Sequence, residues 1–312
     1  MTIDLVTTHQ SEVVADQIDH LGHMNVRFYG VNAFAGTGAL LGELGVEAPS
    51  AWLPVDMYTR HHREQLLGAQ LVVRSGVIDA HTEEVRLYHE LANRDTGALA
   101  ATFVHRLAYR DKVGRDEAGH DLGASTALVA AASARRVTIP AHGATRSIEL
   151  DTDPVTSAPS LDELRRRRLE MRKVRTVTAQ ECDETGAYIP AAAPMLTWGG
   201  ESVSKKVPEM LHELPGGVRM GWASMETRMV IGRLPRFGDR IQSFSAVIGL
   251  HDKTSHRIQW AYDMERGDLL TTFEVVNLAF DVTARASMSI PARIRDAEQT
   301  ALHNDLAPRR ST

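Results

Sequence analysis

The sequence lacks several features that mark particular classes of protein. Cys182 is the only cysteine among 312 residues, so neither an intramolecular disulfide nor a cysteine-rich metal site can form. No run approaches the ~18 apolar residues of a membrane span, and the N-terminus does not resemble a signal peptide. Lys and Arg total 35 against 40 Asp and Glu, which argues against nucleic-acid binding. We therefore expect a cytoplasmic protein with no membrane or nucleic-acid partner.

Several catalytic motifs are also missing. The sequence has no Gly-x-Ser-x-Gly elbow of serine hydrolases, no phosphate loop and no dinucleotide-binding fingerprint. His61 and His62 are adjacent on a predicted strand, so their side chains point to opposite faces and are poorly placed to bind one metal ion. We expect neither a metal nor a cofactor. What is present is a globular composition, with 43% hydrophobic and 24% charged residues.

An internal repeat organises the chain. The segments that follow Gly68 and Gly238 align without a gap at a shift of 170 residues. About ten of roughly forty positions are identical, against about three expected from ordinary residue usage. The run from Asp19 to Gly22 resembles the run from Asp183 to Gly186 at a slightly smaller shift, as an insertion in an intervening loop would produce. We therefore predict that one domain has been duplicated.

Each copy shows the same succession of patterns. A short apolar segment and a turn with Gly precede an apolar stretch of about twenty residues, long enough for a buried helix. In the second copy Pro190 and Pro194 fall in this stretch, and Pro194 is expected to delay or kink the helix. Strand-like runs follow near 53–63, 69–80, 84–94 and 98–110, and again near 220–233, 240–250, 254–264 and 269–280. These patterns predict an α+β fold, one antiparallel sheet wrapped around one long central helix in each copy.

The predicted domain organisation is two such domains, a linker between them and a tail. The predicted bounds are 1–112 for the first domain, 113–170 for the linker, 171–290 for the second domain and 291–312 for the tail. An Ala-rich stretch and the run DELRRRRLEMRK predict helices within the linker. The arginines 165–168 of that run could contact a nucleotide phosphate, but a solvated helix face is the favoured interpretation.

The candidate chemistry lies in residues 19–29, DHLGHMNVRFY. Asp19 stands three residues before Gly22, which permits a tight turn just ahead of the expected helix. The first N–H groups of a helix lack intrahelical partners and carry the positive end of its dipole, so they can stabilise charge that develops on a thioester carbonyl oxygen. Asp19 could attack the carbonyl carbon or activate a water molecule. The alternative role for Asp19 is a simple helix cap.

This pattern resembles the 4-hydroxybenzoyl-CoA thioesterase-like family of hotdog proteins, whose signature reads Asp-x-x-Gly-His-(Val/Met)-Asn-Asn-x-x-Tyr. The matching positions are Asp19, Gly22, His23, Met24, Asn25 and Tyr29, while Val26 stands where a second Asn is usual. The resemblance covers residues 5–110 well and 174–285 more distantly, and it implies two hotdog domains in tandem. Many relatives carry a Glu later on the central helix, and this chain has none there.

The resemblance also implies roles for individual residues. Asp19 would be the nucleophile or general base, and the backbone amides of Gly22 and His23 would polarise the carbonyl. By the same analogy His23 and Asn25 would shape the turn or hold water. Tyr29 is expected to contact the substrate. From their residue type and position, Arg60 and Arg63 are candidates for binding a CoA phosphate.

The second copy retains only part of the signature. Asp183 and Gly186 are present, but Ala187, Ile189 and Ala193 replace the His, Asn and Tyr. Asp183 could therefore be the catalytic residue of a second, altered active site. Alternatively, the second copy could serve mainly as the partner domain that completes the active site of the first. We favour the supporting role.

The expected function is hydrolysis of an acyl-CoA to the free acid and CoA, by a homodimer of double-hotdog chains. Three alternatives stay open: an acyl-carrier-protein (acyl-ACP) thioesterase, a non-catalytic acyl-CoA-binding module, and a hydratase on the same fold. The sequence does not name the acyl chain, because one sequence does not fix the depth of the pocket.

Overall fold

A computed structural model describes residues 4–19, 21–46, 49–81, 83–109, 126–167, 169–201 and 211–310. The chain divides into two compact units, residues 1–144 (unit 1) and 145–312 (unit 2). Within the described ranges, no helix is both long and apolar enough to cross a membrane.

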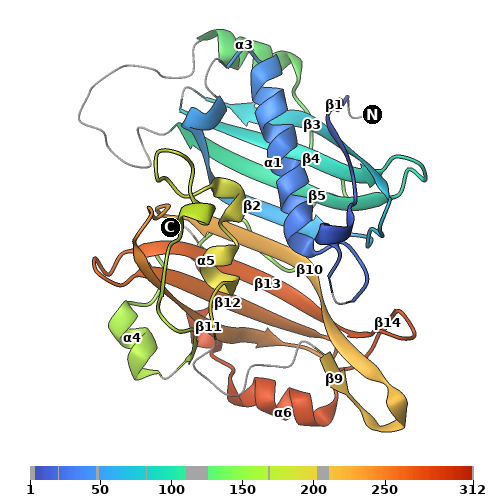
Figure 1. Cartoon of the computed structure of the whole chain (residues 1–312), viewed down its shortest axis with the longest axis vertical. Coiled ribbons are helices and arrows are strands. Elements are labelled where there is room, and N and C mark those ends of the chain that lie inside the picture. Colours follow the sequence, from blue (N-terminus) through green and yellow to red (C-terminus); the bar gives the residue numbers. More distant parts are fainter. Residues whose placement is uncertain are drawn as a thin grey trace. The chain divides into compact units, whose positions relative to one another are not determined.

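Unit 1 is an antiparallel sheet with a long helix lying across one face (Figure 1). Its strands are β1 (Val6–Glu12), β2 (Trp52–His61), β3 (Gln70–Ala80), β4 (Glu84–Asn93) and β5 (Leu99–Tyr109), in the spatial order β1-β3-β4-β5-β2. The helix is α1 (Val26–Glu43), and short 3-10 turns precede α1 (Ala15–Gln17) and β2 (Pro49–Ala51). The predicted strand bounds are confirmed to within about two residues, a usual margin for element ends.

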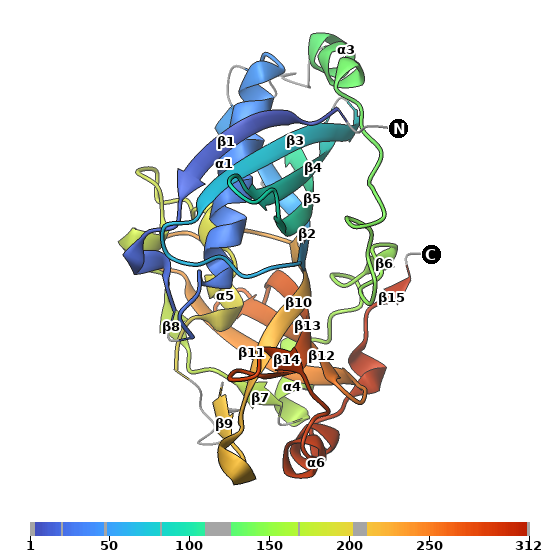
Figure 2. The ribbon, with the colours of Figure 1, turned by 90° about the vertical axis from the view of Figure 1, so that its right-hand side faces the viewer.

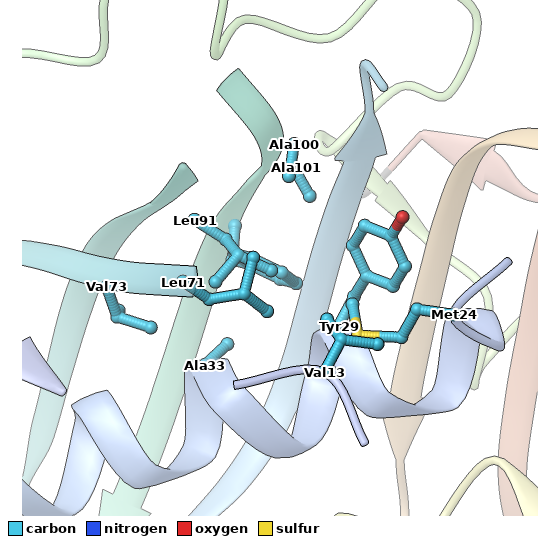
Figure 3. Close-up of a cluster of buried hydrophobic side chains, with 10 residues drawn as sticks. Val13, Met24, Tyr29, Ala33, Leu71, Val73, Leu91, Ala100 and Ala101 are labelled. Carbon is cyan, nitrogen blue, oxygen red and sulfur yellow. The ribbon is translucent and has the colours of Figure 1, made fainter. Parts of the chain in front are cut away.

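The core of unit 1 forms where α1 meets the sheet. Tyr29, Ala33 and Thr37 recur every four residues and are buried, which places them on one face of the helix. Figure 3 shows how side chains from the helix and the preceding turn meet those of the strands. This cluster consists of Val13, Met24, Tyr29, Ala33, Leu71, Val73, Leu91, Ala100, Ala101 and Phe103.

Replacing either of two glycines of α1 by alanine is expected to change the stability of the protein, in opposite directions. A Cβ added at Gly36 would lie 2.7 Å from Val73 Cγ1, whereas one added at Gly38 would meet nothing within 4 Å. Gly36→Ala should lower the free energy of unfolding by about 1–3 kcal/mol through overpacking. Gly38→Ala should raise it by up to about 1 kcal/mol, because alanine is the better helix former. Urea denaturation of both variants measures this, and equal effects would contradict the close helix–sheet approach at Gly36.

The opposite face of the unit 1 sheet is covered by the chain that follows α3 (Thr126–Ala134), as Figure 2 shows. Val137 packs so closely on Gly76 that no side chain would fit there. Nε2 of His142 lies 2.7 Å from Oε1 of Glu90. Part of the predicted linker therefore packs with unit 1, and the predicted Ala-rich helix corresponds to α3.

Unit 2 repeats this strand order. Its main strands are β10 (Arg219–Ile231), β11 (Arg240–Leu250), β12 (Thr254–Asp263) and β13 (Leu269–Asp281), and β11 also pairs with β7 (Glu170–Met171) and β8 (Arg175–Thr176). The spatial order is β7/β8-β11-β12-β13-β10. The remaining strands of unit 2 are β6 (Thr152–Asp153), β9 (Leu211–Glu213), β14 (Ala286–Ser287) and β15 (Arg309–Arg310).

Local irregularities recur at the same positions in both units. The pairing register shifts between Val77 and Asp79 in β3, and between Val247 and Gly249 in β11. A second shift falls at residues 91/92 and again at 261/262. Both pairs differ by the same 170 residues as the sequence repeat. Bulges change strand direction and twist, so their recurrence gives the two sheets the same local shape.

Unit 2 lacks the long central helix expected from the sequence in its described residues. The stretch forms a 3-10 turn (Pro190–Ala192) and α5 (Met195–Trp198), a helix of only 4 residues. Pro194 is the N-cap of α5, and Gly199 is extended and ends it. The prolines therefore delay the helix, as expected, and the two glycines that follow allow the chain to leave it. Residues 202–210 of the predicted helix lie outside the described part of the chain.

The outer face of the unit 2 sheet is covered by the rest of the predicted linker and by the tail. Helix α4 (Leu161–Arg166) is shorter than predicted, and the tail contains α6 (Ala292–Thr300) and a final 3-10 turn (Asn304–Leu306). The carboxylate of buried Glu226 accepts hydrogen bonds from three successive backbone N–H groups, those of Arg146, Ser147 and Ile148. This segment therefore belongs structurally to unit 2.

Candidate active site

The signature residues of unit 1 form a tight turn. The N–H of Asp19 donates to the carbonyl of His23 at 2.9 Å, and the N–H of Gly22 donates back to the carbonyl of Asp19 at 3.0 Å. Gly22 has φ +82°, a conformation that residues with a Cβ seldom adopt. Met24 N–H donates to the carbonyl of Gln65, which ties the turn to the segment after β2.

The helix begins at Val26, where the apolar stretch of the first copy also begins, and not at Gly22 and His23, where its N-terminus was placed. Asn25 is the N-cap of α1, and its Oδ1 accepts the N–H of Arg27 at 3.1 Å. The prediction of a helix N-terminus at Gly22 and His23 is therefore wrong, because the Asn25 side chain caps a helix that begins at Val26. The Gly22 N–H is also occupied within the turn.

Two backbone donors remain at this site. Among the described residues, the N–H groups of His23 and Val26 have no hydrogen-bond partner. The Val26 N–H belongs to the first helical residue, where the positive end of the helix dipole adds to its attraction for negative charge. The arrangement can thus offer donors to a developing oxyanion, but through Val26 and His23 instead of Gly22.

The turn brings two carboxylates to either side of one imidazole. Nδ1 of His23 lies 3.4 Å from Oδ2 of Asp19, and its Nε2 lies 3.6 Å from Oε1 of Glu64. The side chains of Asp19 and His23 are each 14% exposed and that of Glu64 is 36% exposed, so the group is sheltered and still open to water. Oδ1 of Asp19 accepts the N–H of Leu21 at 2.8 Å, which fixes the carboxylate.

Sequence analysis missed Glu64 as a partner of this group. Glu64 lies 45 residues beyond Asp19 in the sequence, on the segment after β2. It attracted notice only as a neighbour of His61 and His62. No local pattern links it to the turn, because contacts between segments distant in the sequence bring the two together.

Tyr29 positions the segment that carries Glu64. Its hydroxyl donates to the carbonyl of Arg63 at 3.2 Å, and its ring meets His61 edge to face with centroids 5.2 Å apart. Burial, with a contribution from the negative charge of Asp19, raises the pKa of Tyr29 to about 12. The hydroxyl therefore stays protonated as a donor at neutral pH.

The two predicted CoA-binding arginines are placed differently. Arg60 donates from Nη1 to the carbonyl of Ala144 at 2.9 Å, next to the chain that covers the opposite face of the sheet. Since neighbouring strand residues alternate between faces, Arg60 points away from the side where His61 meets Tyr29. Arg63 is the residue before Glu64 in the chain, and its side chain is exposed. Only Arg63 is thus brought near the Asp19 turn.

Unit 2 forms the same turn with different chemistry. Asp183 N–H donates to the carbonyl of Ala187 at 2.8 Å, and Gly186 N–H donates to Asp183 at 2.9 Å. Oδ1 of Asp183 accepts from the N–H and hydroxyl of Thr185 at 2.8 and 2.6 Å, and from the N–H of Ala187 at 3.1 Å. Asp183 is exposed, and Ala187 replaces the imidazole. Its carboxylate is therefore engaged in holding the turn.

Comparisons with known proteins agree with this fold. Residues 13–148 match a family profile described as the thioesterase-like superfamily. A search of curated protein sequences found no match.

Three solved structures with a similar fold are described as thioesterases. An acyl-ACP thioesterase from Bacteroides thetaiotaomicron has a TM-score of 0.60 at 12% identity, with 89% of this chain and 100% of that chain covered. The 12:0-ACP thioesterase from Umbellularia californica has a TM-score of 0.60 at 9% identity, covering 87% and 93%. A protein from Lactobacillus plantarum, provisionally assigned as an oleoyl thioesterase, has a TM-score of 0.62 at 9% identity, covering 88% and 96%.

At these identities the likeness concerns the fold alone. The likeness to the thioesterase-like superfamily therefore concerns residues 13–148, and the solved structures add a likeness of fold over most of the chain.

Proposed function

We propose that unit 1 hydrolyses an acyl thioester at the Asp19 turn. The observation that carries the proposal is the placement of the Asp19 and Glu64 carboxylates on either side of His23, beside the N–H groups of His23 and Val26. A carboxylate that can attack or activate water, together with donors for an oxyanion, is the minimum that acyl transfer requires.

The reaction would proceed as follows. The thioester carbonyl oxygen accepts hydrogen bonds from the Val26 and His23 N–H groups, which stabilise the negative charge of the tetrahedral intermediate. Asp19 either attacks the carbonyl carbon or removes a proton from the water that attacks it. If water attacks, its oxygen bonds to the carbonyl carbon, the carbon–sulfur bond breaks, and the proton taken up by Asp19 passes to the sulfur, which leaves as a thiol. If Asp19 attacks, the thiolate leaves and takes a proton from water, and the hydroxide formed cleaves the Asp19–acyl anhydride, which releases the free acid and regenerates Asp19. Glu64 holds His23 in place and is itself open to water, so it can take part in that proton transfer.

We further propose one active site per chain, in two hotdog domains arranged in tandem. Unit 2 retains the turn and the Asp183 carboxylate but has no imidazole there. It also has no carboxylate at the position of Glu64, since the 170-residue shift places Leu234 there. These differences support a structural role for unit 2.

For the thiol half of the substrate we propose CoA, because exposed Arg63 beside the site offers a cation to a phosphate. Acyl-ACP is the second candidate, favoured by the descriptions of two structural neighbours.

Thiol release separates these possibilities. Steady-state kcat/KM should be measured on a panel of acyl-CoAs and on the same acyl groups carried by acyl carrier protein. We expect turnover of acyl-CoA, with a higher kcat/KM than for the protein-bound substrates. The reverse order would reassign the carrier, a hydrated acyl-CoA in place of free thiol would indicate a hydratase, and binding without turnover of any thioester would overturn the enzymatic proposal.

A further inference from the structure

The side chain of Gln65 is buried directly beside the candidate site. Gln65 follows Glu64 on the segment after β2 and is only 4% exposed. Its Nε2 donates to the carbonyl of Glu64 at 2.8 Å and, over a longer distance of 3.4 Å, to that of Arg63. The Arg63 carbonyl also accepts the hydroxyl of buried Tyr29. The backbone on both sides of Glu64 is therefore held by hydrogen bonds from buried side chains.

Asn93, the last residue of β4, fixes the orientation of the Gln65 amide. Oδ1 of Asn93 accepts the N–H groups of Asp95 and Thr96 at 3.1 and 3.0 Å, so its Nδ2 is the group that faces Gln65. This Nδ2 donates to Oε1 of Gln65 at 3.1 Å. Because its oxygen is engaged by a donor, Gln65 presents its own NH2 group to the Glu64 carbonyl. The turn between β4 and β5 thus orients Gln65, and Gln65 holds the backbone of Glu64.

Unit 2 keeps the same backbone link without an amide side chain at this position. The 170-residue shift places Pro235 at the position of Gln65, directly after Leu234, which replaces the carboxylate. The carbonyl of Pro235 accepts the N–H of Tyr188 at 3.2 Å, so the contact between this segment and the turn persists in unit 2. The amide side chain is therefore present in the unit that has the carboxylate and absent from the unit that lacks it, which favours a role connected with the carboxylate.

We propose that Gln65 is a positioning residue for the hydrolysis, which holds Glu64 so that its carboxylate stays beside His23. The inference rests on the proposed thioester hydrolysis and adds a residue that acts through Glu64. Oε1 of Glu64 lies 3.6 Å from Nε2 of His23, and the Glu64 side chain is 36% exposed, so packing restrains it only in part. Fixing the peptide groups on both sides of Glu64 fixes the direction in which its side chain leaves the backbone. Small displacements of a group that transfers protons lower kcat steeply.

Gln65→Met tests this proposal, because Met has a similar length and cannot donate to the Glu64 carbonyl. We would measure kcat and KM for thiol release from one acyl-CoA, together with the midpoint of thermal unfolding. The variant should lower kcat by about tenfold, the effect of losing one well-placed hydrogen bond. KM should change much less, because the buried Gln65 acts on Glu64 and not on the substrate.

Asn93→Asp is a second variant, in which the turn between β4 and β5 should be retained. Asp263 occupies the equivalent position in unit 2, and its Oδ1 accepts two N–H groups of the turn in the same way. A carboxylate cannot donate to Oε1 of Gln65, so the Gln65 amide should turn its NH2 group toward the new carboxylate and release the Glu64 carbonyl. Asn93→Asp should therefore lower kcat as Gln65→Met does.

A double variant separates positioning from a general structural role. If Gln65 acts through Glu64, Gln65→Met should lower kcat no further in a protein that already carries Glu64→Gln, since substitutions within one functional unit are not additive. A loss of folded protein alone would instead lower kcat by the same factor in both backgrounds.

Gln70→Met is the matched control. The side chain of Gln70, in β3, also donates to a backbone carbonyl, that of Gly68 at 3.3 Å, and its replacement should leave kcat unchanged. Unchanged kcat in a correctly folded Gln65→Met or Asn93→Asp variant, or an equal loss with and without Glu64→Gln, would overturn the inference and leave the proposed function standing. Failure of the wild-type protein to hydrolyse any acyl thioester would instead overturn the proposed function, and the inference with it.

Discussion

Asp19→Asn is expected to lower kcat for thioester hydrolysis by at least about a thousandfold, as loss of the central group of a catalytic site typically does. Asn is neutral, so it can neither attack a carbonyl carbon nor remove a proton from water. The comparison is well matched, because an amide oxygen can still accept the Leu21 N–H that now binds Oδ1 of Asp19 at 2.8 Å. The turn should therefore persist, and KM should change much less than kcat.

Steady-state kinetics together with the midpoint of thermal unfolding separate chemistry from folding. A kcat within tenfold of the wild-type value, at an unchanged midpoint, would show that Asp19 is only a turn residue. The carboxylate would then serve only to hold the turn by accepting the Leu21 N–H, since Asn25 is the residue that caps α1.

Glu64→Gln is expected to lower kcat by about a hundredfold, within the usual range for a residue that assists proton transfer. The Glu64 carboxylate lies 3.6 Å from Nε2 of His23, and the neutral amide that replaces it can neither take up nor release a proton. The pH dependence of kcat should change shape in this variant, a response that simple loss of packing would not produce.

Glu12→Gln provides the matched control for Glu64→Gln. Glu12 is an exposed carboxylate at the end of β1, so its neutralisation should leave kcat and its pH profile unchanged. A Glu64→Gln variant that behaves like this control would remove Glu64 from the proposed mechanism.

The sequence predicts the strands well, because each is encoded by its own local pattern. Residues 99–109 and 269–281, for example, form strands close to their predicted limits. The repeat of 170 residues likewise appears in the register shifts of both sheets. Where a structure depends on residues near in sequence, the pattern alone is sufficient.

The ends of the helices were predicted less well, because they depend on the backbone preferences of single residues. The carbonyl-polarising amides were expected at Gly22 and His23, but the side chain of Asn25 caps α1, which begins at Val26. In unit 2 the apolar content of 189–211 suggested a long helix, while Gly199 and Gly200 end α5 after Trp198. In both units the apolar stretch favoured a helix, but the conformational preferences of single residues decided where the helix begins and ends.

Contacts between distant segments could not be read from the sequence. Glu64 lies beside His23 where the Met24 N–H donates to the Gln65 carbonyl and joins the two segments. The histidines 89 and 105 stand on separate strands, and only the pairing of β4 with β5 places both beside Thr37. In both cases contacts between segments distant in the sequence decide which side chains are neighbours.

The central claim is one hydrolytic site per chain, built on Asp19 and not on Asp183. The most direct measurement is thiol release from one acyl-CoA by the wild-type protein, Asp19→Asn and Asp183→Asn, each checked for an unchanged unfolding midpoint. We predict that Asp19→Asn loses nearly all activity and that Asp183→Asn keeps most of it. Full activity in Asp19→Asn, or equal losses in the two variants, would contradict the claim.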